Sequence, residues 1–357
     1  AGKLDQIIFA GWTHEPAETL ARGLLEIMPP DLTRIFFSDS GSTSVEVALK
    51  MALGFWANSG QPRHRILVME HSYHGDTIGA MSVGARGVFN APYTPLLFDV
   101  GTIPYPALGR EQATLDALEA ACRAAPAAFI VEPLVLGAGG MLFYPAWVLA
   151  EMRAICARHG VLFIADEVMT GWGRTGTLLA CEQAGVVPDI LCLSKGITGG
   201  AVPLAVTMAS EAIYEAHLSQ DRARMFFHSS SYTANPIACA AANANLAIWR
   251  EEPVRDRIAA LAVRQRQRLD ALATHPGFAN PRALGTIAAV DIEDREDAGY
   301  LSHRAPALLA HFRERDLLLR PLGNTVYVMP PYCIDDADLD RIYAGIADAA
   351  KATAHPG

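Results

Sequence analysis

The sequence predicts an α/β fold with a largely parallel sheet, followed by a smaller C-terminal α+β region. Short apolar runs bounded by turn residues recur from about residue 35 to residue 250, and such runs are typical of strands buried on both faces of a sheet. Amphipathic helical segments alternate with these runs, which favours parallel strands joined by helices. The 357 residues, 51% of them hydrophobic, suffice for a large core and for more than one domain.

The predicted elements are regular enough to be placed along the chain. In order, the predicted strands are 35–37, 65–69, 128–131, 161–166, 190–194 and 206–209. The clearest helix begins near Thr43, because apolar residues recur from Val45 at i, i+3, i+4, i+7, i+8 and i+11. A long helical stretch from about 235 to 272 leads into the C-terminal region. That region contains short strands at 286–290 and 326–329 and helices around Leu308 and Ile342.

Composition argues against several classes of function. The net charge of -9, without any basic run, argues against a nucleic-acid surface. No uninterrupted apolar stretch is long enough to span a bilayer, and the first residues do not resemble a signal peptide. The six cysteines lack CxxC or framework spacing, so we expect reduced thiols in a cytoplasmic protein. The histidines show no ligand spacing, so we expect no metal site.

Lys195 and Asp166 are the most informative residues of the chain. Lys195 follows the apolar run 190–194, and Asp166 ends the run 161–166. Because ligands of α/β sheets bind beyond the carboxyl ends of the strands, we expect both side chains in one crevice. A lysine that can form a Schiff base and an acid that can pair with a pyridinium nitrogen are what pyridoxal 5′-phosphate (PLP) requires. Taken singly, the lysine is more often a solvated loop residue and the acid a helix cap.

Other segments fit a cofactor site, but each also has a structural explanation. Residues 38–43 (SDSGST) join a strand to a helix, where a helix N-terminus either binds an anion or is simply capped. Tyr73, in YHGDT, either stacks on a cofactor ring or packs in a turn. The hydroxyl groups of 228–236 (HSSSYTANP) either cap a helix, contact a phosphate, or do both. Arg320 either binds a substrate carboxylate or lies on the surface.

The order of these segments resembles the class III PLP-dependent aminotransferases over nearly the whole chain. The resemblance rests on DSGSTSVEVALKMAL, YHGDTIGAMSV, EPLVLGAGGM, ADEVMTGWGRTG, LCLSKGITGG, NPIACAAANANLAI and RPLGNTVYVMPPY. It implies the PLP-dependent transferase fold type I (aspartate aminotransferase-like) and a homodimer with shared active sites. The sequence itself places a domain boundary near 251–253. With the resemblance, we expect a remnant of an N-terminal segment (1–14), a large PLP-binding domain (15–252) and a small C-terminal domain (253–357).

The resemblance implies a role for each site residue. Lys195 forms the Schiff base with the cofactor and transfers the proton, and Asp166 pairs with the pyridinium nitrogen. Tyr73 stacks on one face of the ring and Val168 packs against the other. Gly41 and Ser42 bind the phosphate, and Ser230 and Ser231 contact the phosphate of the neighbouring subunit. Arg320 binds the carboxylate of the keto acid. The substrate is also contacted by Tyr73, Asp76, Ser229 and Tyr327.

Within the class, the segments are most similar to enzymes of biotin synthesis. The implied reaction is ping-pong: a donor amine converts PLP to pyridoxamine phosphate, and 8-amino-7-oxononanoate then takes the amino group to give 7,8-diaminononanoate. We expect S-adenosylmethionine as the donor, although HSSSYTANP replaces the HGPTF form of its users and also fits lysine. The alternatives are a broad ω-amine transaminase, an aminomutase of the same fold and a non-catalytic PLP-binding protein. The presence of Lys195 disfavours the last of these.

Overall fold

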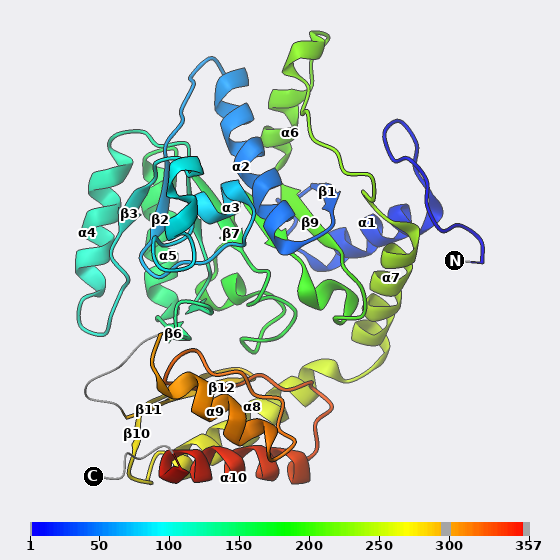
Figure 1. Ribbon diagram of the computed structural model, residues 1–357. Coiled ribbons are helices and arrows are strands. Elements are labelled where there is room, and N and C mark those ends of the chain that lie inside the picture. Colours follow the sequence, from blue (N-terminus) through cyan, green and yellow to red (C-terminus); the bar gives the residue numbers. More distant parts are fainter. Residues whose placement is uncertain (1, 294–300, 353–357) are drawn as a thin grey trace. The chain divides into compact units, whose positions relative to one another are not determined.

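The computed structural model describes residues 2–293 and 301–352, and it confirms the predicted α/β class. The chain forms two compact units (Figure 1). The first comprises Ala1–Leu136, Tyr144–Trp172 and Leu179–Glu252. The second comprises Gly137–Phe143, Gly173–Leu178 and Pro253–Gly357, so two short segments from the first half of the chain belong to it.

The first unit is built around a seven-stranded sheet with the strand order β1-β9-β8-β7-β4-β2-β3. Its strands are β1 (Arg34–Ser38), β2 (Ile66–Met69), β3 (Gly101–Ile103), β4 (Ala128–Val131), β7 (Leu162–Asp166), β8 (Ile190–Leu193) and β9 (Ala205–Ala209). Within this sheet, β9 runs antiparallel to both of its neighbours and the other pairs are parallel. The carboxyl ends of β4, β7 and β8 therefore meet at one edge of the sheet, which is where ligands of such sheets bind.

Helices cover the sheet of the first unit, and their apolar sides explain why its strands are apolar throughout. These helices are α1 (Glu15–Ile27), α2 (Gly41–Asn58), α3 (Ile78–Ser82), α4 (Glu111–Cys122), α5 (Ala146–Arg158), α6 (Glu211–His217) and α7 (Pro236–Glu251). The apolar stripe predicted from Val45 packs in one buried cluster with residues of β2, β7 and β8. Every residue of β2, β4 and β8 is buried, as expected for strands covered on both faces.

The second unit packs helices on a three-stranded antiparallel sheet. Its strands are β10 (Phe278–Leu284), β11 (Ile287–Ile292) and β12 (Thr325–Val328), and its helices are α8 (Val254–Leu272), α9 (Arg304–Arg313) and α10 (Asp336–Ala352). Gln265 of α8 is a buried polar residue that joins these layers. Its Nε2 donates to the carbonyl oxygens of Thr286 (3.1 Å) and Val328 (3.2 Å), and its Oε1 accepts from the hydroxyl of Tyr343 (2.6 Å). Each of its polar groups is therefore satisfied.

Three features differ from the sequence-based expectation. The predicted helical stretch 235–272 is two helices, because Pro253 has no N–H to donate and restricts the residue before it. The strands β3 and β10 were not predicted, since β3 has only three residues and β10 contains Pro281 and Arg282. The two-residue strands β5 (Val135–Leu136) and β6 (Leu142–Phe143) were also not predicted.

Among the described residues, no helix is both long and apolar enough to cross a membrane.

Candidate active site

Lys195 lies just beyond the carboxyl end of β8, on a tightly held turn. Its backbone adopts φ +38°, a conformation that is uncommon for a residue with a side chain and that is often found at functional sites. Ser194 anchors the turn on one side by donating from Oγ to the Leu204 carbonyl (2.8 Å). On the other side, Asn245 Nδ2 donates to the carbonyl oxygens of Gly196 (2.9 Å) and Ile197 (3.1 Å). The exposed lysine side chain is thus presented from a fixed backbone.

Asp166 ends β7, and its parallel partner in β8 is Cys192, three residues before Lys195. Its side chain is only 6% exposed, and it accepts from His74 Nδ1 (2.7 Å) through Oδ2 and from the Val168 amide (3.1 Å) through Oδ1. Burial, and then the charge of Asp166, raise the pKa of the Cys192 thiol well above its usual range. The Cys192 thiol is therefore uncharged, and Asp166 is the group of this pair that can bind a cationic ligand. The sequence did not single out His74.

Glu167, the other acid of the predicted Asp-Glu pair, has a structural role. It is fully buried and accepts three hydrogen bonds: from Thr170 Oγ1 (2.6 Å), the Ala180 amide (3.0 Å) and the Cys181 amide (2.8 Å). Burial raises its pKa, and these hydrogen bonds oppose that shift. Glu167 thus ties the residues after β7 to the segment at 180–181, and Asp166 is the carboxylate of the pair that a ligand can use.

Tyr73 is held next to Asp76 in the loop after β2. Its amide donates to Glu132 Oε1 (2.9 Å) and its hydroxyl donates to Asp76 Oδ2 (2.9 Å). Glu132 follows β4 and is buried, and its carbonyl accepts from the Tyr144 hydroxyl (2.8 Å). The partly exposed ring of Tyr73 therefore lies on a loop that is fixed to the neighbouring strand end, as a stacking residue requires.

The N-terminus of α2 has a cap that leaves its first turn able to bind an anion. Ser40 Oγ accepts from the Thr43 amide (3.2 Å), and Thr43 Oγ1 accepts from the Ser40 amide (2.9 Å), which together form a capping box. The amides of Gly41 and Ser42 lie in the first turn, where a helix provides no carbonyl partners. The cap and the phosphate cradle, which the sequence left as alternatives, are therefore compatible.

Two glycines make close approach possible around this first turn. A Cβ on Gly41 would lie 2.7 Å from Val168 Cγ1, so Val168 packs directly over the start of α2. A Cβ on Gly75 would lie 2.1 Å from Ser42 Oγ, which accepts a hydrogen bond from the Asp76 amide (3.2 Å). Three segments, at the ends of β1, β2 and β7, thus converge on the N-terminus of α2.

We expect Gly75→Ala to weaken cofactor binding by about tenfold or more and to lower the melting temperature, because overpacking and a positive φ each cost about 1–3 kcal/mol. Gly75 has φ +128°, and the new methyl group would displace Ser42. Gly60→Ala is the matched control, since Gly60 also has a positive φ but has open space around it. Thermal unfolding of the apoprotein and equilibrium dialysis with PLP measure the two effects. Wild-type PLP affinity in Gly75→Ala would contradict the assignment of the phosphate to the first turn of α2, where Ser42 lies.

The three serines at 229–231 lie in the loop before α7. Ser230 Oγ donates to Asp39 Oδ2, at the end of β1, and also accepts from the Tyr232 amide (3.3 Å). Ser229 and Ser231 are exposed. The structure thus brings Ser230 close to the start of α2 in the same chain, whereas its implied contact with a neighbouring subunit remains a prediction.

Arg320 and Tyr327 belong to the second unit. Arg320 is exposed and precedes a tight turn in which Leu322 and Thr325 exchange backbone hydrogen bonds (2.8 and 3.0 Å). Tyr327 lies on β12 and is half-buried. In the same unit, the Arg174 guanidinium donates to the Pro330 carbonyl (2.6 Å) and stacks over the Tyr332 ring (4.7 Å). The sequence did not identify Arg174 as a residue that fixes this loop.

These residues fit PLP. The first unit offers an exposed lysine amine on a fixed turn, a buried carboxylate on the adjacent strand end, and a helix N-terminus with glycine-lined surroundings. An amine, an acid and an anion site match the aldehyde, ring nitrogen and phosphate of the cofactor. A groove of about 870 Å³ between α4 and α5 is lined by carboxylates and an arginine, but by no lysine that could form a Schiff base.

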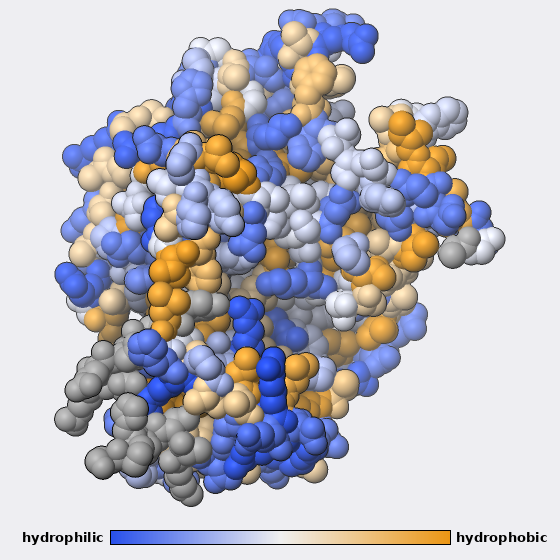
Figure 2. All heavy atoms as spheres, viewed as in Figure 1, coloured by the Kyte–Doolittle hydropathy of each residue, from blue (hydrophilic) through white to orange (hydrophobic). Residues whose placement is uncertain are grey.

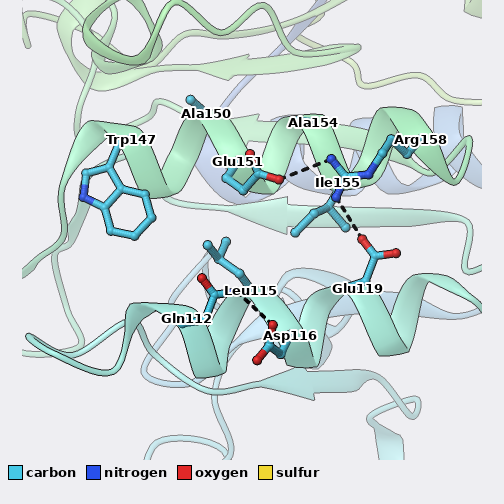
Figure 3. Close-up of a pocket in the computed structure, with 10 residues that line it drawn as sticks. All are labelled: Gln112, Leu115, Asp116, Glu119, Trp147, Ala150, Glu151, Ala154, Ile155 and Arg158. Atoms are coloured by element: carbon cyan, nitrogen blue, oxygen red, sulfur yellow. Dashed lines mark hydrogen bonds and ion pairs between the residues drawn. The ribbon is translucent and has the colours of Figure 1, made fainter.

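The charged groups in that groove pair with one another (Figure 3). Arg158 contacts Glu119 (2.9 Å) and Glu151 (3.2 Å), and Gln112 donates to Asp116 (2.8 Å). None of the residues predicted for the site lines the groove, so we place the candidate active site at the strand ends.

Known proteins are similar to this chain over nearly its whole length. The model of the aminotransferase class-III family matches residues 1–350. The adenosylmethionine-8-amino-7-oxononanoate aminotransferase of Synechococcus elongatus is 49% identical over 98% of this chain and 84% of its own length. The crystal structure of the enzyme of the same name from Methanocaldococcus jannaschii superposes with a TM-score of 0.93 at 30% identity, over 98% of this chain and 82% of that one. A PLP-bound amine transaminase from an uncultivated Pseudomonas species has a TM-score of 0.89 at 32% identity, over 97% and 83%. The chain therefore belongs to the class-III aminotransferase family.

Proposed function

We propose that this protein is a PLP-dependent adenosylmethionine-8-amino-7-oxononanoate aminotransferase (7,8-diaminopelargonic acid synthase), which converts 8-amino-7-oxononanoate to 7,8-diaminononanoate in biotin biosynthesis. The observation that carries this proposal is the 49% identity to a relative of that name over nearly the whole chain. The positions of Lys195 and Asp166 at adjacent strand ends support the chemistry. We propose S-adenosylmethionine as the amino donor, because the relative's name includes it.

Each residue of the proposed site has one role in binding the cofactor or in moving a proton. When bound, PLP supplies a carbonyl group for the amine and a ring that takes up the electron pair left when the amine carbon loses its proton. Lys195 holds the cofactor through its amine and moves that proton. Asp166 pairs through its carboxylate with the ring nitrogen and keeps a proton on it. Tyr73 packs on the ring, and the first turn of α2 binds the phosphate.

The substrate contacts follow the same division. We propose that Arg320 pairs with the carboxylate of the keto acid, because a guanidinium forms two parallel hydrogen bonds with a carboxylate and so orients a long substrate. Asp76, Ser229 and Tyr327 line the remaining substrate surface in this proposal. Val168, which contacts Gly41, packs on the ring face opposite Tyr73.

A single-turnover reaction of the PLP-loaded protein tests the proposal. S-adenosylmethionine, lysine and a simple amine are mixed in separately while the cofactor absorbance is followed, and 8-amino-7-oxononanoate is then added. We expect S-adenosylmethionine alone to react rapidly and the keto acid to reverse the change. Reaction with lysine, reversed by the same acceptor, would keep the pathway and replace the donor. Reaction only with simple amines, without reversal, would support the alternative of a broad ω-amine transaminase, which the amine transaminase relative favours.

We expect Arg320→Ala to raise the KM for the keto acid about 10- to 100-fold with PLP affinity unchanged, because the lost hydrogen bonds are to a charged group. Steady-state kinetics with varied acceptor and equilibrium dialysis with PLP check the two quantities. Arg313→Ala, at another exposed arginine of the same unit, is the control. An equal loss of PLP binding in Arg320→Ala would refute its role toward the substrate.

We also propose a homodimer with shared active sites and a cytoplasmic location. Support for the dimer comes from exposed apolar side chains on two segments of the first unit, namely Val88, Phe89, Tyr93, Leu96 and Phe98, and Met225, Phe227 and Tyr232. Such concentrations of exposed apolar groups are typical of association surfaces. On the face shown in Figure 2, apolar residues form several patches among hydrophilic ones.

The cytoplasmic location is supported by six free cysteines, including the exposed Cys333.

A further inference from the structure

Helix α7 supports the turn that carries Lys195 through two of its side chains. Asn245 and Trp249 lie four residues apart on this helix, so they are neighbours on one face. The helix packs against the turn formed by residues 195–198. Neither residue has a part in the cofactor or substrate contacts proposed above.

Asn245 binds the backbone of the turn directly. Its Nδ2 donates to the carbonyl oxygens of Gly196 (2.9 Å) and Ile197 (3.1 Å), the two residues after Lys195. A Cβ on Gly199 would lie 3.4 Å from Asn245 Oδ1, so the same amide also borders the end of the turn. The two hydrogens of one amide group thus match two consecutive carbonyl groups, which fixes the direction of the turn relative to α7.

Trp249 supports the same turn through Trp172. The two indole rings meet edge to face, with centroids 5.8 Å apart and an interplanar angle of 68°, which is a favourable arrangement of aromatic rings. Trp172 is 2% exposed, and a Cβ on Gly196 would lie 2.5 Å from Trp172 Cβ. Trp172 therefore packs directly on the backbone of the residue that follows Lys195.

These contacts act on a backbone conformation that is unfavourable without them. Lys195 has φ +38° and Trp172 has φ +58°, and residues with side chains keep such values only where their surroundings impose them. A change in the φ of Lys195 rotates its Cβ about the N–Cα bond and so moves the amine relative to the end of β8. The position of the amine therefore depends on the groups that hold this φ at its present value.

We propose that Asn245 and Trp249 are positioning residues that hold the Lys195 amine where it attaches PLP, an inference that rests on the proposed PLP-dependent function. In this step the unprotonated amine adds to the aldehyde carbon of PLP. Both of its hydrogens leave with the aldehyde oxygen as water, and a carbon–nitrogen double bond remains. The rate depends on the orientation of the amine, since a misplacement of about 1 Å can slow a reaction about 10²-fold. The phosphate and ring contacts lie on other segments, so we expect non-covalent binding of PLP to be independent of the two residues.

Substitution of Asn245 separates attachment from binding. The apoprotein is mixed with increasing concentrations of PLP, and absorbance and borohydride trapping follow attachment to Lys195. We expect Asn245→Ala, and Asn245→Asp, which removes the donor at nearly constant shape, to lower the limiting rate about tenfold or more. The PLP concentration that gives half of this rate should stay within about threefold of the wild type. Asn243→Ala is the matched control, since Asn243 lies on the same helix and donates to the carbonyl oxygen of Pro16 (2.9 Å).

Substitution of Trp249 tests the second contact with a conservative variant. Trp249→Phe keeps an aromatic ring against Trp172, whereas Trp249→Leu does not. We expect the limiting rate of attachment to fall about 3- to 10-fold in Trp249→Leu and less than about twofold in Trp249→Phe, because an edge-to-face pair contributes about this factor. Equal rates in the two variants would show that Trp249 only fills space, and would overturn its part of the proposal.

Hydrogen exchange of the apoprotein tests the role of Asn245 without any cofactor. The amides of Gly199 and Gly200 donate to carbonyl groups within the turn, so their exchange reports its opening. We expect peptides that span 194–200 to exchange about tenfold faster in Asn245→Ala than in the wild type. The same peptides should exchange at the wild-type rate in Asn243→Ala.

Several results would overturn the role of Asn245. These are a wild-type attachment rate or wild-type exchange in Asn245→Ala, an equal slowing in Asn243→Ala, and a loss of PLP affinity as large as the loss of rate. If Asn245→Ala does not fold, Asn245→Asp and the two Trp249 variants decide the question. If the wild type attaches PLP at Lys195 but reacts with no donor, the proposed function fails, and the attachment rates still decide this inference.

Discussion

Lys195→Ala is expected to reduce turnover by about 10⁴-fold or more and to abolish covalent attachment of PLP. The residue is both the attachment point and the base in the proposed mechanism, and a positioned base alone typically contributes about 10²–10⁴-fold. Because Lys195 is exposed, its removal sacrifices little packing, so we expect the melting temperature to change little. The chain has four lysines, which makes the covalent assignment simple.

The measurement is borohydride reduction of the PLP-loaded protein followed by peptide mass analysis. We expect a pyridoxyl group on the peptide that contains Lys195 in the wild type, and no label in the variant. Lys3→Ala is the control, since Lys3 is also exposed. Single-turnover rates with the donor then measure the loss of activity. A labelled peptide elsewhere in the wild type, or near wild-type turnover in Lys195→Ala, would show that another residue carries the chemistry.

The sequence alone was enough to predict which residues follow the ends of two buried strands. Lys195 and Asp166 follow apolar runs, and the structure places those runs side by side as β8 and β7. The helix near Thr43 was equally clear, because α2 buries one continuous stripe. In each case the informative pattern lies within a few neighbouring residues, so periodicity and turn residues reveal it without any knowledge of distant contacts.

The supporting contacts could not be predicted, because they join residues far apart in the chain. His74 reaches Asp166 across 92 positions, and Ser230 reaches Asp39 across 191. His74 follows Tyr73 in the YHGDT segment, and nothing in that segment shows which of the two rings is buried. The break at Pro253 had a local signal, namely the proline itself, and a stricter use of that signal would have divided the predicted helix.

Asp166→Asn is expected to lower turnover about 10²- to 10⁴-fold while leaving the fold intact. Asparagine has nearly the same shape, and its Oδ1 can still accept from the Val168 amide, while its Nδ2 can donate to His74 Nδ1 if that imidazole changes tautomer. We therefore expect the melting temperature to fall only modestly. Asparagine carries no negative charge, however, and a neutral amide does not stabilise a protonated ring nitrogen. Removing the charge therefore tests the electrostatic role with the least structural disturbance.

The electrostatic role makes a second outcome measurable. Asp166→Ala leaves space beside the ring nitrogen, so we expect a cofactor methylated on that nitrogen, which is permanently cationic, to restore part of the lost rate. Asp31→Asn, at an exposed aspartate, is the control for loss of one charge elsewhere. Near wild-type turnover in Asp166→Asn would contradict the assignment of Asp166. Equal rates with the normal and the methylated cofactor in Asp166→Ala would instead assign the residue a geometric role, since a fixed positive charge substitutes only for the electrostatic function of the carboxylate.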